Sequence, residues 1–96
     1  MPSGWVLQST DETPIVLRLA GDIVKTIGRA GADFVVDAAL VSRLHCRLIA
    51  DAAGLVVEDL NSTNGTFVNG EAVTRATLSP GDRLGVGRVE FTVSFA

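Results

Sequence analysis

The sequence predicts an all-β domain, either a sandwich or a barrel. Short segments rich in β-branched residues recur along the chain, ten glycines and three prolines separate them, and no stretch has a sustained helical stripe. Many short strands joined by tight turns are typical of sandwiches and barrels. The best helical candidate, residues 38–41, is too short to persist as a helix on its own.

The strands are predicted from apolar residues that recur at every second position and from the turn residues that bound each segment. The clearest case is residues 89–95, in which apolar and polar residues alternate throughout. The individually predicted strands are residues 15–19, 23–27, 46–50, 55–58 and 89–95.

The turns are predicted from residues that tolerate unusual backbone angles. Asn69-Gly70 is the strongest short hairpin signal because both residues accept positive φ. It separates Phe67-Val68 from Glu71-Ala72-Val73. Residues 79–82 place a proline and a glycine where a tight turn needs them, and Ala53-Gly54 joins two neighbouring strands. Gly85 and Gly87 lack the third glycine of a dinucleotide fingerprint and predict close backbone packing or a bulge.

Length and composition predict one domain over residues 1–96, with no linker or repeat. The chain is 47% hydrophobic and 20% charged, which is too apolar for a disordered segment. No apolar run is long enough to cross a membrane, and the start of the chain lacks the features of a signal peptide. We therefore expect an intracellular protein, cytoplasmic or, in a eukaryote, nuclear, that does not bind membranes.

Charge and cysteine content exclude further classes. The net charge of −3 argues against a broad nucleic-acid surface, which would normally be basic. Cys46 is the only cysteine, which excludes an internal disulfide and a multi-cysteine zinc site. At the start of an apolar strand, Cys46 is expected to be a small buried hydrophobe. No metal-ligand cluster or cofactor motif is present, and the oligomeric state is not predicted.

Three predicted loops are too polar or too rich in glycine for a core. They carry two arginines, several hydroxyls and a side-chain amide, all of which can donate hydrogen bonds to an anion. Two arginines roughly offset one phosphate monoester, whose charge is about −1.5 to −2 near neutral pH. The loops are residues 28–31, 42–45 and 61–66.

The order of these motifs resembles the forkhead-associated (FHA) domain, a phosphothreonine-binding module. The resemblance covers essentially the whole chain, from a first strand near Trp5 to a last strand ending at Phe95. It implies an eleven-stranded β-sandwich of two twisted, mainly antiparallel sheets, with the recognition loops at one end. The motifs that carry it are Gly28-Arg29, Ser42-Arg43-x-His45, Ser62-Thr63-Asn64-Gly65-Thr66 and Asn69-Gly70.

The resemblance also implies a role for each matching residue. Arg29, Ser42 and Thr63 would contact the phosphate, and Asn64 would hold the peptide main chain. Arg43 stands at a position that varies in the family and would bind either phosphate or peptide backbone. The residues expected to support the loops without touching the ligand are Gly28, His45, Gly65 and Asn69.

The resemblance implies that the partner is a phosphothreonine-containing protein or peptide. A small apolar niche would select the threonine methyl over phosphoserine. Family members also discriminate the side chain three residues after the phosphothreonine. Leu40 and Val41 make the neighbourhood of Ser42 apolar, which predicts an aliphatic preference at that peptide position.

Two other functions compete with phosphopeptide recognition. Ser42 and His45, with Asp51 or Asp59, contain the residue types of a serine hydrolase, but no nucleophile elbow accompanies them. A scaffold domain could share the fold and bind its partner without phosphate. The complete set of donors argues against a scaffold.

Overall fold

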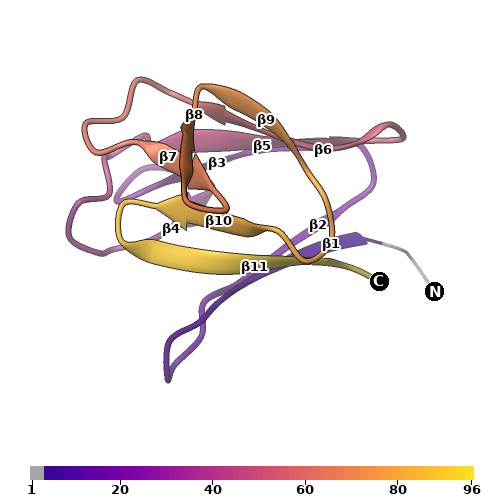
Figure 1. The fold of residues 1–96 in the computed structure, drawn as a ribbon, viewed down its shortest axis with the longest axis horizontal. Coiled ribbons are helices and arrows are strands. Elements are labelled where there is room, and N and C mark those ends of the chain that lie inside the picture. Colours follow the sequence, from indigo (N-terminus) through magenta and orange to yellow (C-terminus); the bar gives the residue numbers. More distant parts are fainter. Residues whose placement is uncertain (1–3) are drawn as a thin grey trace.

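The computed structural model describes residues 4–96, which contain eleven strands and no helix (Figure 1). In chain order the strands are β1 (Gly4–Ser9), β2 (Val16–Ala20), β3 (Ile23–Gly28), β4 (Phe34–Val35), β5 (Cys46–Asp51), β6 (Gly54–Asp59), β7 (Thr66–Val68), β8 (Glu71–Val73), β9 (Arg75–Leu78), β10 (Arg83–Val86) and β11 (Val89–Phe95). The prediction of an all-β chain is confirmed. Residues 4–96 include no helix long and apolar enough to span a membrane.

The strands form two sheets. Six strands make one sheet in the order β2-β1-β11-β10-β7-β8, and five make the other in the order β4-β3-β5-β6-β9. Every pairing is antiparallel except that between β3 and β4. The eleven-stranded, mainly antiparallel sandwich that the resemblance implied is therefore confirmed.

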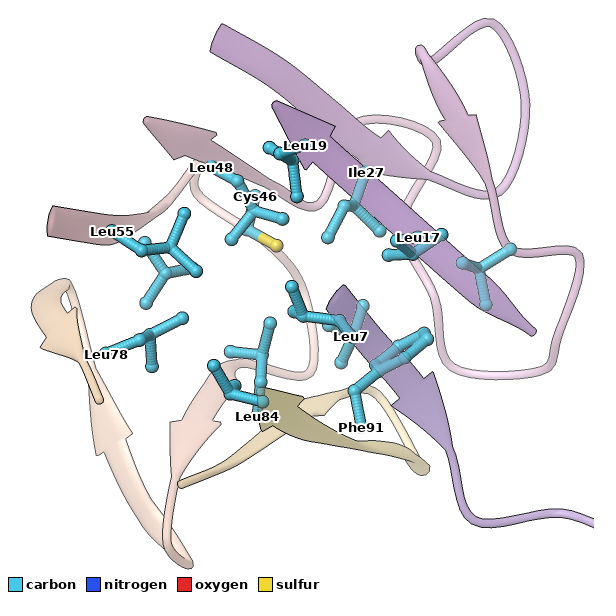
Figure 2. Close-up of a cluster of buried hydrophobic side chains, with 14 of the residues drawn as sticks. Leu7, Leu17, Leu19, Ile27, Cys46, Leu48, Leu55, Leu78, Leu84 and Phe91 are labelled. Carbon is cyan, nitrogen blue, oxygen red and sulfur yellow. The ribbon is translucent and has the colours of Figure 1, made fainter. Parts of the chain in front are cut away.

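The core lies between the two sheets and is formed by alternate residues of each strand. In β11, Phe91 and Val93 are buried while Thr92 and Ser94 are exposed, which is the alternation that the sequence predicts. Figure 2 shows leucines from both sheets converging around the same interior. Cys46 is buried in this cluster as predicted, and burial raises the pKa of its thiol to about 12. The thiol is therefore protonated at neutral pH.

The turns follow the predicted backbone chemistry. Asn69 and Gly70 have φ values of 52° and 85° and join β7 to β8 as a two-residue hairpin. In the turn before β10, Asp82 N–H donates to the carbonyl of Ser79 at 3.0 Å, and Gly81 has a φ of 94°. Proline followed by a glycine with positive φ makes this a type II turn. Both turns were predicted from their residues alone.

The two ends of the sandwich contain different parts of the chain. Figure 1 shows the loops between β4 and β5 and between β6 and β7 at the left end. The β5–β6 hairpin and the end of β11 lie at the right end. We call these the loop end and the distal end. The three polar segments found in the sequence belong to the loop end.

Candidate functional site

The first two polar loops meet through backbone contact at Gly28. A Cβ atom at this position would lie 1.8 Å from the carbonyl oxygen of Arg43, which is far inside van der Waals contact. Beside it, Arg29 N–H donates to the carbonyl of Ser42 at 2.9 Å. Only glycine therefore fits at Gly28, and its absent side chain lets Arg29 and Ser42 lie together.

The Arg29 side chain is exposed but held in place. Its Nε donates to the carbonyl of Val41 at 3.1 Å. This bond uses one of the guanidinium N–H groups and leaves the terminal ones for another acceptor. A guanidinium fixed in this way presents a planar set of donors at the loop end.

Ser42 connects the second loop to the third. Its Oγ accepts a hydrogen bond from Thr63 N–H at 3.0 Å, across 21 residues of sequence. Because Oγ is the acceptor in this bond, the hydroxyl hydrogen of Ser42 remains available to donate. The Ser42 backbone N–H donates in turn to Nδ1 of His45 at 3.1 Å.

His45 is fully buried and both of its ring nitrogens are engaged. Nδ1 accepts from Ser42 N–H, so the ring proton is on Nε2, which donates to the carbonyl of Gly65 at 2.7 Å. Its backbone N–H donates to Ile27, and its carbonyl accepts from Leu60. His45 thus joins β3, the second loop and the third loop.

Asn64 reaches back to the turn before Ser42. Its Nδ2 donates to the carbonyl of Leu40 at 3.2 Å. Leu40 has a φ of 70°, an uncommon conformation for a residue with a side chain. A Cβ at Gly87 would lie 2.7 Å from the same carbonyl oxygen, so the β10–β11 turn packs closely here, as predicted for this glycine.

Asp59, which sequence reasoning named only for the hydrolase alternative, holds the third loop in shape. Asp59 Oδ1 accepts from the hydroxyls of Ser62 at 2.5 Å and Thr66 at 2.8 Å, and Oδ2 accepts from Ser62 N–H at 3.2 Å. Ser62 Oγ also accepts from Gly65 N–H at 3.0 Å. The signal that could have identified this contact is the spacing from Asp59 to Ser62, because Asp side chains commonly bond backbone N–H groups a few residues on.

The pKa of Asp59 reflects these contacts. Burial by itself raises the pKa of the carboxyl group, but the hydrogen bonds from Ser62 and Thr66 outweigh it. The pKa therefore lies below the ordinary value for aspartate. The ionised carboxylate is the form that accepts all of these bonds.

The structure gathers most of the sequence-predicted residues at the loop end. Gly65 has a φ of 92°, which favours glycine, and its carbonyl is the acceptor for His45. Arg43 and Thr63 are exposed on the second and third loops. Asn69 lies elsewhere: its Nδ2 donates to Asp82 at 3.1 Å.

Asn69 therefore stabilises a turn outside the three polar loops. Its Oδ1 accepts from Arg83 N–H at 3.0 Å, and its own N–H donates to the carbonyl of Arg83 at 2.8 Å. These bonds fix the start of β10 against the β7–β8 hairpin. The resemblance placed Asn69 among the loop supports, and in the structure the support goes to the turn before β10.

The chain matches known proteins in sequence and in structure. A family model described as the FHA domain matches residues 25–87. The ABC transporter ATP-binding/permease protein Rv1747 of Mycobacterium tuberculosis is 39% identical over 77 residues, which are 76% of this chain and only 9% of that transporter.

Two solved structures superpose closely. One comes from a structural and functional analysis of phosphothreonine-dependent FHA domain interactions, with a TM-score of 0.87, 34% identity and 95% of both chains covered. The other is the FhaA FHA domain complexed with the intracellular domain of Rv3910, with a TM-score of 0.85 and 34% identity, covering 93% of this chain and 98% of that one.

Fold and site together define a β-sandwich binding module, in which hydrogen bonds between loops support exposed donors at one end. The family model covers most of the chain, and the superposed structures cover nearly all of it. The chain belongs to the FHA domain family. FHA domains are binding modules and not enzymes.

Proposed function

We propose that this domain binds phosphothreonine in partner proteins and mediates phosphorylation-dependent protein–protein interaction. The observation that carries the proposal is the bond from Thr63 N–H to Ser42 Oγ at 3.0 Å. It joins two loops and leaves the Ser42 hydroxyl hydrogen free to donate. Arg29 is fixed beside it by its bond to the Val41 carbonyl.

The phosphate would be bound by charged and neutral donors together. The terminal N–H groups of Arg29 supply charge-assisted bonds, each contributing about 1.5–3 kcal/mol, against about 0.5–1.5 kcal/mol for a neutral bond. Ser42 and Thr63 supply hydroxyls. Arg43 is exposed on the same loop as Ser42 and adds a second positive charge. The two arginines compensate the local anion although the whole chain has a net charge of −3.

Asn64 would bind the peptide main chain. One of its Nδ2 hydrogens is bonded to the Leu40 carbonyl, which fixes the amide plane. The other hydrogen and Oδ1 remain to pair with a peptide carbonyl and N–H. Gly28, His45 and Gly65 would act only through the loops they hold.

The geometry of His45 favours recognition over catalysis. A serine hydrolase needs a histidine nitrogen that accepts the proton of the serine hydroxyl. Here Nδ1 accepts from the backbone N–H of Ser42, and Nε2 donates to the Gly65 carbonyl. Neither nitrogen is free to act as a base toward Ser42 Oγ.

The flanking specificity would be set in part by Leu40. Its side chain is 42% exposed next to the second loop, whereas Val41 is buried and unavailable to a peptide. Leu44, 50% exposed, adds apolar surface on the same loop. We expect an aliphatic side chain three residues after the phosphothreonine to be preferred. A peptide array that selects aspartate there would refute this preference.

Titration with a degenerate phosphothreonine peptide library tests both activity and specificity. We expect binding to be lost on dephosphorylation and to be weaker for phosphoserine peptides. Equal affinity for phosphorylated and plain peptides would support a phosphate-independent scaffold instead. Hydrolysis of a generic ester that is lost in Ser42→Ala would support an enzyme.

A further inference from the structure

The distal end of the sandwich leaves part of its core face uncovered. Trp5 and Phe95 are paired across β1 and β11, on the same face as the buried pair Leu7 and Val93. Their rings meet edge to face with centroids 4.8 Å apart. Phe95 nevertheless remains 50% exposed. Trp5 packs partly against the core, so this last pair of side chains on the core face is covered only in part.

Small residues on the facing hairpin explain the gap. The turn between β5 and β6 consists of Ala52 and Ala53, and β6 starts at Gly54. Together with the two aromatic residues and Pro80, this hairpin lines a groove of about 330 Å³. The groove lies at the opposite end from the three polar loops (Figure 1).

Two carboxylates border the same region. Asp22 and Asp51 line a hollow of about 180 Å³ that shares Trp5 and Phe95 with the groove. They lie one step beyond the Ile23–Ala50 pair, at the end of the β3–β5 ladder. Like charges on neighbouring strands are unfavourable to each other. None of the ion pairs formed within residues 4–96 includes either carboxylate.

We propose that this distal groove binds an arginine side chain, with its apolar neighbours, from a segment of a partner protein. A guanidinium stacks on aromatic rings and pairs with carboxylates through planar N–H donors. Trp5 and Phe95 supply the rings, and Asp22 and Asp51 supply the negative charge. This site is independent of phosphopeptide binding at the loop end.

The arrangement excludes other ligand classes at this groove. An acidic peptide would meet two carboxylates, and a purely apolar segment would leave them without a counter-charge. Arg18, the one cation of β2, lines a different hollow with Trp5 and Ala20. It does not line either of the two hollows that contain Asp51.

Titration of the ¹⁵N-labelled domain with acetyl-Leu-Arg-Leu-amide tests the proposal. We expect saturable shifts of the Trp5 indole N–H and of the amides of residues 51–54. The matched probe replaces arginine by citrulline, which removes the charge and keeps the shape. It should bind at least about fivefold more weakly, the ratio that about 1 kcal/mol represents.

A double variant, Asp22→Asn with Asp51→Asn, should weaken the arginine peptide by about the same fivefold factor. Asparagine at residue 51 keeps an oxygen that can accept from Ala53 N–H, a bond of 2.8 Å that fixes the turn. The control variant is Asp11→Asn with Glu12→Gln, in the exposed β1–β2 loop, and should have no effect. Affinity for a phosphothreonine peptide should be the same in all these proteins.

Several results would overturn the proposal. Absence of saturable shifts, or shifts unchanged in the double variant, would show that no cation binds here. Equal binding of the citrulline probe would identify a purely apolar site, and equal binding of a lysine probe would exclude an arginine-specific one. Sedimentation showing self-association that the double variant abolishes would make a second copy of this chain the occupant.

Discussion

The two ends of the sandwich are closed by different kinds of contact. At the loop end, hydrogen bonds join residues far apart in sequence, such as Ser42 with Thr63 and His45 with Gly65. At the distal end, the β5–β6 turn is closed locally by the bond from Ala53 N–H to Asp51, and the long-range Gly4–Ala96 bonds only extend the β1–β11 backbone ladder. Long-range bonds fix several loops relative to one another, which a multipoint ligand requires. The small β5–β6 turn leaves a groove beside Trp5 and Phe95 at the distal end.

The largest effect is expected for His45→Ala. Removing the ring leaves the Ser42 N–H and the Gly65 carbonyl without their partner, and each buried unpaired group costs about 1–3 kcal/mol. We expect the free energy of unfolding to fall by about 2–4 kcal/mol. Urea denaturation measures it.

Phosphopeptide affinity should fall in the same His45 variant because the loops lose their common support. If His45→Ala does not fold, His45→Gln keeps a side chain that can both donate and accept, and its stability and affinity should lie between those of wild type and the alanine variant. An alanine variant with unchanged stability and affinity would contradict the role assigned to His45.

Arg29→Ala should cause the next largest effect, on binding alone. Loss of even one charge-assisted bond, about 1.5–3 kcal/mol, corresponds to a dissociation constant roughly 10- to 150-fold larger. Calorimetric titration with a phosphothreonine peptide gives the constant, and thermal unfolding checks that the fold survives. Arg18→Ala is the matched control, because Arg18 is exposed on β2 outside the loop end. Equal losses in both variants would mean that affinity depends on net charge and not on the site.

Asp59→Asn, compared with Asp51→Asn, tests whether the hydrogen bonds at the loop end contribute more to stability than those of the distal turn. Asparagine keeps one oxygen for the hydroxyls of Ser62 and Thr66, but these bonds lose their charge and its amide N–H groups would face the Ser62 N–H from which Oδ2 accepts. We therefore expect a loss of about 1–2 kcal/mol at pH 7. The distal counterpart, Asp51→Asn, keeps its acceptor and should change stability by less than about 0.5 kcal/mol. Urea denaturation of both variants tests the difference, and an equal loss in the two would contradict it.

The pH dependence of stability gives a second test of Asp59. Its pKa is lower in the folded protein, so its contribution is complete above the unfolded value of about 3.9 and is lost as the pH falls through the folded value. The stability difference between wild type and Asp59→Asn should therefore shrink in acid. A difference that stays constant from pH 7 down to strongly acidic pH would show that the carboxylate charge is not involved.

The smallest effects are expected at the two Asn-Gly pairs. Asn64→Ala removes the bond to the Leu40 carbonyl and should weaken phosphopeptide binding about 3- to 10-fold. Asn69→Ala should leave affinity unchanged and lower stability by about 1 kcal/mol, because Asn69 bonds Asp82 and Arg83. Peptide titration and urea denaturation of both variants test this assignment. A reduced affinity in Asn69→Ala would contradict it.

Much of the fold could be predicted from sequence because its signals are local. Strand β11 alternates apolar and polar residues, and the Asn69-Gly70 hairpin needs only positive φ at two neighbouring positions. The short strand β4 (Phe34–Val35) has no comparable signal, since its pairing with β3 is parallel and covers two residues.

The candidate loops could be found from donor-rich composition, and their residue roles from resemblance to a family. The contacts of Asp59 with Ser62 and Thr66 could not, because they depend on how the third loop folds. The positive φ of Leu40, whose carbonyl lies against Asn64 and Gly87, also has no signal in the local sequence. The distal groove depends on which strands face each other across the core.

The most direct test of the central claim is an amide chemical-shift map recorded with a phosphothreonine peptide and with the same peptide dephosphorylated. We predict that only the phosphorylated peptide produces saturable shifts, concentrated at Arg29, Ser42, Arg43, Thr63 and Asn64. The distal groove, followed by the Trp5 indole N–H, should not respond. Equal shifts with both peptides, or shifts located away from the three loops, would contradict phosphothreonine recognition by this site.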